Sequence, residues 1–164
     1  MASLRAAWTR WSEIDFILLP QVFLVAAAVP VLLRLRLARL QRLLGRVPLG
    51  RHADAARIQA ILRCTTIVLR RGHPLIRRGC LTRGVTLYYF LRRAGLEVDL
   101  CFGAGYLDGE FAAHCWLERD REPFQETADP RKIFAEMYRL PGGLPSSAGT
   151  VRIGGLPRRP GAWS

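Results

Sequence analysis

Apolar residues occupy this chain at three different spacings, and each spacing predicts a different kind of element. The first is a run of 18 residues, 16–33 (FILLPQVFLVAAAVPVLL), broken only by Pro20, Gln21 and Pro30. A helix needs about 20 apolar residues to span a bilayer, and internal prolines kink or divide it. We therefore expect a pair of hydrophobic helices that cover the core or dock a partner, with membrane association through 16–33 as the alternative.

Helical spacing returns after this run and predicts three further helices. Leucines recur at i, i+4, i+7 and i+11 over residues 33–44, with the arginines off this stripe, which is typical of an amphipathic helix. A second helix is expected from Asp54, a residue type suited to capping, to Leu69. A third begins at Cys80 and ends before Gly95, a residue type suited to the position after a helix C-terminus.

Beyond Gly95 the apolar residues alternate with a period of two, which predicts strands. The stretch GAGYLDGE is expected to form a hairpin-like loop between the first two strands. Asp129 and Pro130 are expected to open a short last helix that ends near Leu140. The alternating residues place the three strands at 98–102, 114–118 and 124–126.

The charge of the chain is strongly positive, with a formal net charge of +12 and a sequence pI near 11.1. Such an excess favours anionic partners such as acidic peptides, nucleic acid or anionic lipid. Lys132 is the only lysine, so 25 − 1 = 24 of the basic residues are arginine, and they are spread along the chain instead of forming one run. No nucleic-acid reader motif accompanies them, so we expect no nucleic-acid partner.

Four cysteines would allow two disulfides, but their spacing is not that of a secreted scaffold and no signal-peptide pattern precedes them. We therefore expect free thiols in a reducing cytoplasm. No metal or other cofactor is expected, because there is no CxxC pair and the neighbours His114 and Cys115 would face opposite sides of a strand. The other cysteines are Cys64, Cys80 and Cys101.

Cys80 differs from the other cysteines because it follows Gly79 at the start of an expected helix. First-turn amides and the positive end of the helix dipole favour a thiolate there, and the thiolate is the nucleophilic form. His114 lies on an expected strand that holds its ring, whereas His52 and His73 lie in loops rich in helix-breaking residues. A nucleophilic cysteine with a histidine as general base and acid is suited to acyl transfer.

A third residue must accept the other imidazole proton and fix the tautomer. Glu118 shares the expected face of His114 but lies about 13 Å away along the same strand. Glu126, on the returning strand, can lie beside His114 and is preferred. Trp116, two residues after His114, is expected either to wall the site or to pack in the core. The acids considered are Glu118, Asp120, Glu122, Glu126 and Asp129.

The stretch from Gly79 to Glu126 resembles the transglutaminase-like proteases of lasso-peptide biosynthesis. Members of that family show a Cys-Leu-x-Arg start to the helix, a Leu-Arg-Arg-x-Gly end, a Phe-x-Ala-His-x-Trp strand and an acid about a dozen residues on. In this chain the three motifs read CLTR from Cys80, LRRAG from Leu91 and FAAHCW from Phe111.

Three positions depart from that family pattern. Serine commonly follows the motif arginine, where this chain has Gly84, and alanine commonly stands between the histidine and the tryptophan, where this chain has Cys115. Gly84 loses a hydrogen-bonding group near the site and weakens the helix by up to about 1 kcal/mol relative to alanine. Glu126 stands where the family pattern has an aspartate, which keeps the negative charge and makes the side chain longer.

The resemblance implies an α+β fold, with a catalytic helix packed on a small antiparallel sheet as in transglutaminase-like and papain-like cores, and an N-terminal helical segment. It implies that Cys80, His114 and Glu126 are catalytic, and that Arg83 and Trp116 contact the substrate. The resemblance and the composition together predict three parts of the chain. These are a hydrophobic and arginine-rich helical segment at 1–50, a transglutaminase-like catalytic domain at 51–140 and a disordered tail at 141–164.

The function implied by the resemblance is that of a cysteine peptidase, which removes the leader from a ribosomally made lasso-peptide precursor through a thioester. The implied partners are that precursor, a separate leader-binding protein and a lasso cyclase, in the cytoplasm or at a membrane. Two alternatives stay open. One is a transglutaminase-like acyltransferase with an amine acceptor, and the other is a non-catalytic, membrane-associated scaffold of the same pathway.

Overall fold

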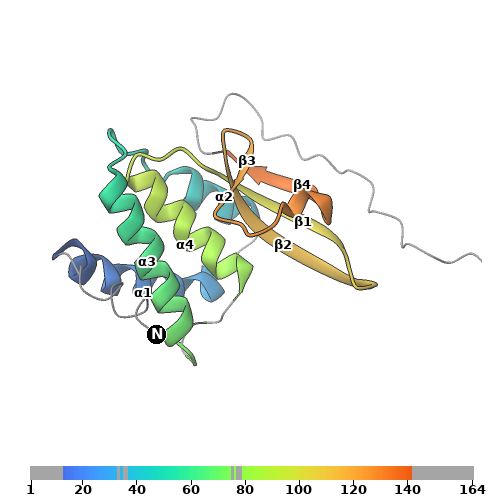
Figure 1. Cartoon of the computed structure of the whole chain (residues 1–164), viewed down its shortest axis with the longest axis horizontal. Helices are drawn as coiled ribbons and strands as arrows, with labels where there is room; N and C mark the ends of the chain where they lie inside the picture. The colour runs from blue at the N-terminus through green and yellow to red at the C-terminus, as the bar shows by residue number, and fades with distance from the viewer. Residues whose placement is uncertain (1–12, 33, 35–36, 75, 77–78, 142–164) are drawn as a thin grey trace, which may run out of the picture.

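The computed structural model describes residues 13–32, 34, 37–74, 76 and 79–141, so the expected tail lies outside the described residues except for Pro141. Figure 1 shows the helices gathered on one side of an antiparallel sheet, which gives the expected α+β arrangement. The long helices α1, α3 and α4 pack on one another, and α4 also packs on strand β2. The fold-class prediction is confirmed.

Helix α1 (Glu13–Leu32) is one continuous helix that contains both Pro20 and Pro30, so the expected division into a pair of helices is wrong. Each proline removes one backbone hydrogen bond. Packing offsets this cost, because residues spaced at i, i+4, i+8 and i+11 are buried against the other helices. In the described part of the chain, no helix has the length and apolar character needed to cross a membrane. The buried α1 residues are Leu18, Val22, Ala26 and Val29.

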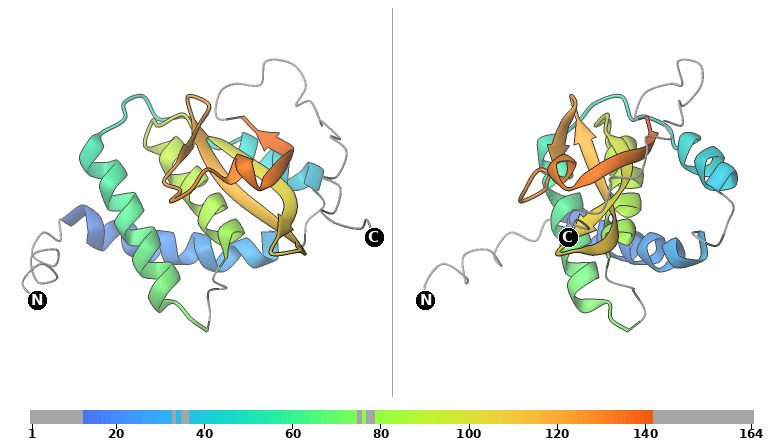
Figure 2. Two further views of the ribbon diagram at one scale, coloured as in Figure 1. Left: turned by 45° about the vertical axis from the view of Figure 1, so that its right-hand side comes forward. Right: turned by 90° about the vertical axis from the view of Figure 1, so that its right-hand side faces the viewer.

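The next three helices begin and end close to where the sequence predicts them. Helix α2 (Leu37–Gly45) buries Leu40 and Leu44, as expected for an amphipathic helix. Helix α3 (Ala55–Arg71) is capped by Asp54, whose Oδ1 accepts a hydrogen bond from Ala56 N at 3.0 Å. The second view in Figure 2 shows α2 at the periphery of the molecule, apart from the other helices.

Helix α4 (Cys80–Arg93) carries the expected nucleophile as its first residue. Gly79 precedes the helix in extended backbone. Gly95 follows it with a φ of 86°, a left-handed conformation that glycine adopts without a Cβ penalty. Both ends of this helix therefore confirm the sequence prediction.

Four antiparallel strands make one sheet in the order β3-β2-β1-β4. Strands β1 (Asp99–Leu107) and β2 (Glu110–Arg119) are longer than expected, because residues 103–107 continue β1 and do not form a loop. Only Asp108 and Gly109 make the turn, with φ of 52° and 81°. Positive φ at both positions is the type I′ geometry that an Asp-Gly pair favours.

The expected last helix is wrong beyond its first turn. Asp129 and Pro130 do open a helical segment, but it is a 3-10 turn (Pro130–Lys132) that is followed by strand β4 (Phe134–Leu140). Pairing with β1 satisfies the backbone of this segment, and Tyr138 and Leu140 are buried. Tertiary pairing overrides the helix signal of the Asp-Pro start.

The two faces of the sheet have different roles. Leu100, Cys115 and Leu117 join the helices in the hydrophobic core. Because side chains alternate along a strand, His114 and Trp116 lie on the other face of β2. The candidate site therefore forms where the helix layer meets the edge of the sheet and not within the core.

Candidate active site

Cys80 occupies the first position of α4, with a partly buried side chain that packs against the core and a free thiol. The helix has no side-chain cap at Gly79, so its first amides are not occupied by a capping group. Orphan amides and the helix dipole stabilise negative charge at this end. Cys80 therefore stands at the positive end of α4 with a partly accessible thiol.

His114 is held on β2 by two aromatic rings. Its ring stacks on Trp116, with centroids 6.1 Å apart and an interplanar angle of 13°, and on Phe134 at 5.1 Å and 30°. Trp116 is itself fully buried and donates a hydrogen bond from Nε1 to Glu118 Oε1 at 2.9 Å. Gly103 makes room for it, since a Cβ there would lie 2.8 Å from the indole ring. The orientation of the imidazole is therefore fixed by packing.

Glu126 connects the sheet to helix α4. Its Oε2 lies 3.5 Å from His114 Nε2, and its Oε1 accepts a hydrogen bond from Arg83 Nη1 at 2.6 Å. Arg83 Nη2 also donates to the carbonyl of Gln125. The carboxylate is largely buried, with 14% of its side chain exposed. One side chain therefore contacts both the histidine and an arginine one turn after Cys80.

The structure departs from the sequence prediction in how it presents Glu126. Strand β3 (Glu122–Phe124) ends two residues before Glu126, which we expected to lie on that strand. Gln125 has a φ of 59°, so the backbone leaves the extended conformation there. The turn brings Glu126 to the edge of the sheet, where Arg83 holds it.

The other four candidate acids contact different partners. Glu118 bonds to Trp116 and Arg139, and Asp120 pairs with Arg119. Glu122 and Asp129 both pair with Arg131. Of the five acids, Glu126 is the one that the structure places beside His114.

Cys80 and His114 come from different layers, and Glu126 with Arg83 is the link between them. A hydrogen bond from Cys80 Sγ to His114 is not among the contacts of the described residues. The catalytic pairing of these two residues therefore stays a prediction. Arg83, which we expected to contact substrate, is engaged with Glu126 and Gln125.

A cavity of about 230 Å³ lies beside Arg83, between α3, α4 and the segment at Gln125. The Thr65 hydroxyl borders it, is buried, and finds no hydrogen-bond partner among the described residues. No sequence signal marked Thr65 or Gln125 as part of a site, because α3 and the segment after β3 meet only in the fold. The remaining lining residues are Leu62, Thr66, Leu69, Arg70 and Leu87.

Comparison with known proteins gives one match. The family model described as transglutaminase-like superfamily matches residues 24–139, which is more than half of the chain. The chain belongs to the transglutaminase-like superfamily. No curated protein and no solved structure matches it. The superfamily includes cysteine peptidases and acyltransferases, both of which suit a cysteine at a helix start.

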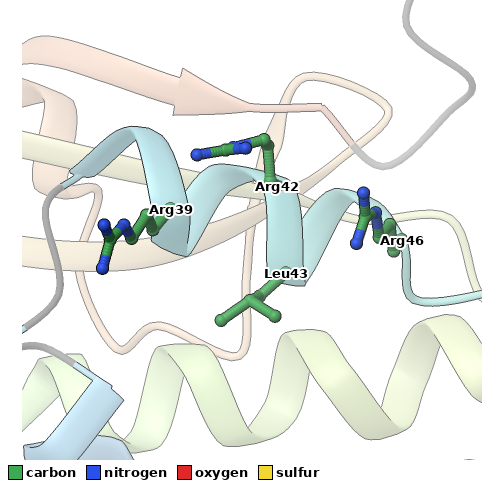
Figure 3. A pocket seen from close by; sticks show the side chains of 4 residues that line it. All are labelled: Arg39, Arg42, Leu43 and Arg46. Carbon is green, nitrogen blue, oxygen red and sulfur yellow. The ribbon is translucent and has the colours of Figure 1, made fainter.

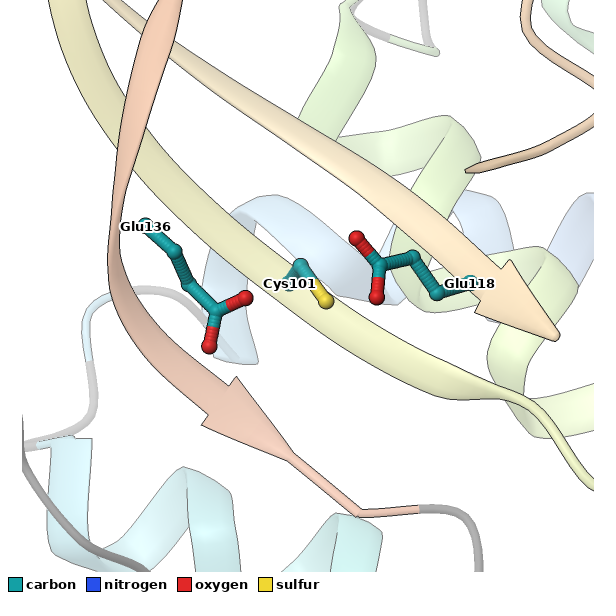
Figure 4. Close-up of side chains that lie close together, drawn as sticks. All are labelled: Cys101, Glu118 and Glu136. Atoms are coloured by element: carbon teal, nitrogen blue, oxygen red, sulfur yellow. The ribbon is translucent and has the colours of Figure 1, made fainter. Parts of the chain in front are cut away.

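This transglutaminase-like protein has a second group of titratable side chains, formed by Cys101, Glu118 and Glu136 on three adjacent strands (Figure 4). Their ligand atoms lie within 4.8 Å of one another, as in a metal site. However, Arg139 bonds to Glu118 at 2.6 Å, to Glu136 at 2.6 Å and to Asp99 at 2.7 Å. These bonds, with Glu136 the strongest contributor, raise the pKa of Arg139 above its ordinary value.

The surroundings of this group favour an ion pair over a metal site. Burial raises the pKa of the Cys101 thiol far above its ordinary value, so the thiol is neutral beside the carboxylates. The Arg139 guanidinium already neutralises the carboxylates. We interpret the group as an ion-pair network that fixes β4 against β1 and β2.

Gly84 and Cys115, two of the positions that depart from the pattern the sequence resembles, lie against each other in the structure. A Cβ on Gly84 would lie 2.7 Å from Cys115 Sγ and 3.1 Å from Leu100 Cδ1. Burial, followed by the nearby Cys80 and Glu126, raises the pKa of the Cys115 thiol, so this thiol stays neutral. The glycine therefore makes room for the larger side chain on β2, and the two departures act as one compensating exchange.

Gly84→Ser is expected to lower the free energy of unfolding by about 1–3 kcal/mol, because the added atoms overpack against Cys115. Adding Cys115→Ala should recover most of this loss, although Cys115→Ala alone leaves a small cavity and destabilises. Urea denaturation of the two single variants and the double variant measures the coupling. If the losses of the two single variants simply added up in the double variant, the proposed compensation between Gly84 and Cys115 would be contradicted.

Proposed function

We propose that this chain is a cysteine peptidase that cleaves the leader from a ribosomally synthesised lasso-peptide precursor. The observation that carries the proposal is the Glu126 carboxylate, which contacts His114 from β2 and Arg83 from the CLTR helix start. Glu126 thus links the histidine to the helix that begins at Cys80, which supports a Cys-His-acid site. The lasso-peptide substrate is supported by the motifs around Cys80, Leu91 and Phe111.

In this mechanism Glu126 accepts a hydrogen bond from the Nε2–H group of His114, which leaves Nδ1 to take the proton of the Cys80 thiol. The thiolate attacks the carbonyl carbon of the scissile peptide. A C–S bond forms and the C–N bond breaks, and the leaving amine takes its proton from His114. Water, deprotonated by His114, then hydrolyses the thioester and releases the carboxylate of the leader. The Cys80 amide at the helix start is the expected oxyanion donor.

Arg83 serves this mechanism by holding the acid. Its 2.6 Å bond to Glu126 is shorter than the 3.5 Å separation of Glu126 from His114, so the guanidinium fixes where the carboxylate stands. Arg83 is also on the same helix as Cys80. The cavity beside Arg83 is bordered by the Thr65 hydroxyl, which has no hydrogen-bond partner within the part of the chain that the structure describes, and it supports a peptide-binding role for this side of the site.

The proposed function is tested by mass spectrometry of the reaction with a lasso precursor and its leader-binding protein. We expect free leader with a hydrolysed carboxylate, and a core peptide with a new amino terminus for the cyclase. A leader joined to an added amine would instead indicate an acyltransferase. An intact precursor in the presence of the leader-binding protein would contradict the peptidase and favour the scaffold.

Glu126→Gln is expected to reduce cleavage about 100-fold, because the amide keeps the shape of the side chain but loses the charge that stabilises the imidazolium. Glu122→Gln is the matched control, since Glu122 is exposed and pairs with Arg131. Steady-state kinetics on the same precursor measures both variants. If Glu126→Gln cleaved at the rate of the control, another acid would have to be the third residue.

A further inference from the structure

The exposed side of α2 carries three arginines around a leucine. Arg39, Arg42 and Leu43 follow one another at i, i+3 and i+4 and share one side of the helix, and Arg46 lies in the turn directly after it. All four are exposed, and Leu43 retains 46% of its surface. They line a surface cavity of about 270 Å³, and Figure 3 shows the arginines spread along successive turns with Leu43 among them. We call this surface the α2 groove.

The other side of α2 holds the helix in place. Leu40, Leu44 and Val47 are buried. The Val47 carbonyl accepts a hydrogen bond from Arg92 Nε at 3.2 Å, and Gly50 N donates to the Arg92 carbonyl at 2.8 Å. The α2 groove is therefore presented by a helix that is anchored to the C-terminal end of α4.

Several arginines elsewhere in the molecule are neutralised by carboxylates. Arg83, Arg131 and Arg139 each pair with one or more acids. In contrast, no carboxylate pairs with Arg39 or Arg46 within the described residues. Grouped cations around an apolar side chain are complementary to carboxylates that flank an apolar residue.

We propose that the α2 groove binds an acidic segment of the peptide substrate, with carboxylates at the arginines and an apolar side chain against Leu43. This inference names a substrate class, and it rests on the proposed function only in calling the bound peptide a substrate. A concave surface built around Leu43 favours a peptide side chain over the flat surface of a bilayer. The charge also steers an acidic peptide toward the protein.

The position of the groove sets where the acidic segment must lie. The α2 groove is anchored near Arg92, whereas Cys80 begins the same helix α4. Fourteen residues make up α4, so these ends lie about 20 Å apart at 1.5 Å per residue. An extended peptide covers that distance with about six residues. The proposal therefore places the acidic segment several residues away from the cleaved bond.

The proposal is tested by fluorescence anisotropy with the full chain carrying Cys80→Ala, so that binding is measured without cleavage. The probe is a labelled peptide of four Glu-Glu-Leu repeats, and the matched peptide has glutamine for every glutamate. We expect the glutamate peptide to bind and the glutamine peptide not to bind. The triple variant R39Q/R42Q/R46Q should weaken binding at least about tenfold at low salt.

A matched triple variant controls for the loss of net charge. R51Q/R57Q/R119Q removes three exposed arginines from other parts of the surface and should change the affinity by less than about twofold. Equal weakening by the two triple variants would overturn the proposal, because the attraction would then be non-specific. Undiminished binding in R39Q/R42Q/R46Q would overturn it as well.

Two further probes separate the peptide from other anions. Vesicles of phosphatidylglycerol and phosphatidylcholine, or a single-stranded oligonucleotide, could bind in place of the peptide. If either bound, lost binding in R39Q/R42Q/R46Q, and the peptide did not bind, the α2 groove would be a lipid or nucleic-acid surface and the proposal would be wrong. None of these results bears on cleavage at Cys80, so the proposed peptidase would be unaffected.

Discussion

Replacing Cys80 with alanine is expected to reduce precursor cleavage at least about 1,000-fold, to the level of the uncatalysed reaction, with the fold intact. The thiolate supplies the bond that forms in the first step, and neither His114 nor Glu126 can replace it. Cys80 is the first residue of α4 and only partly buried, so alanine leaves little strain or empty space. The loss should therefore appear in kcat with an unchanged thermal unfolding temperature.

Cys115→Ala is the matched control for this variant. It also removes one thiol, but from the core face of β2, where burial raises the pKa of Cys115 and keeps it neutral. We expect it to keep cleavage within a few-fold of the unmodified chain. Full cleavage by Cys80→Ala would exclude Cys80 as the nucleophile and favour the scaffold.

Thiol labelling tests the same assignment without a substrate. Cys64, Cys101 and Cys115 are buried and Cys80 is partly exposed, so iodoacetamide should modify Cys80 first in the folded protein. Peptide mapping identifies the modified residue. Preferential labelling of any buried cysteine would contradict the assignment of Cys80 as the reactive thiol.

The sequence predicted best the features that depend on a few neighbouring residues. Asp54 as a cap, Cys80 as the first residue of α4 and Gly95 after its end follow from local backbone chemistry, and the structure confirms all three. The contact of Glu126 with His114 was also anticipated, since a returning strand brings an acid back to the histidine. The path of the backbone to Glu126 was not predicted, because Gln125 turns the chain out of strand β3 with a positive φ.

Other features could not be predicted because partners distant in sequence decide them. Packing on α3 and α4 keeps α1 continuous through Pro20 and Pro30. Pairing with β1 makes residues 134–140 a strand. The contact of Gly84 with Cys115 and the bond of Arg83 to Glu126 join α4 to segments more than 25 residues away. Periodicity within one segment contains no information on such pairs.

Arg139→Met is expected to lower the free energy of unfolding by about 3 kcal/mol. Glu118 is 2% exposed, and Arg139 neutralises it at 2.6 Å while also binding Asp99 and Glu136. Methionine fills a similar volume but leaves the buried carboxylate with Trp116 Nε1 as its remaining side-chain donor. Urea denaturation at neutral pH measures the loss.

A second substitution separates loss of charge from loss of packing. Without Arg139, Glu118 is a buried carboxylate close to Asp99 and Glu136, and the cation that neutralised it is gone. Adding Glu118→Gln should recover at least about half of the loss, because the amide still accepts from Trp116.

Arg131→Met is the comparison that shows whether burial decides the size of the effect. Arg131 also pairs with two acids, Glu122 and Asp129, but it is 39% exposed and lies beside the 3-10 turn. Water screens an exposed ion pair and solvates the carboxylates that lose their partner. Its removal should therefore cost much less free energy of unfolding than removal of Arg139. Equal losses for the two arginines would mean that Glu118 is not a buried charge that depends on Arg139, and that β4 is held by its backbone pairing with β1.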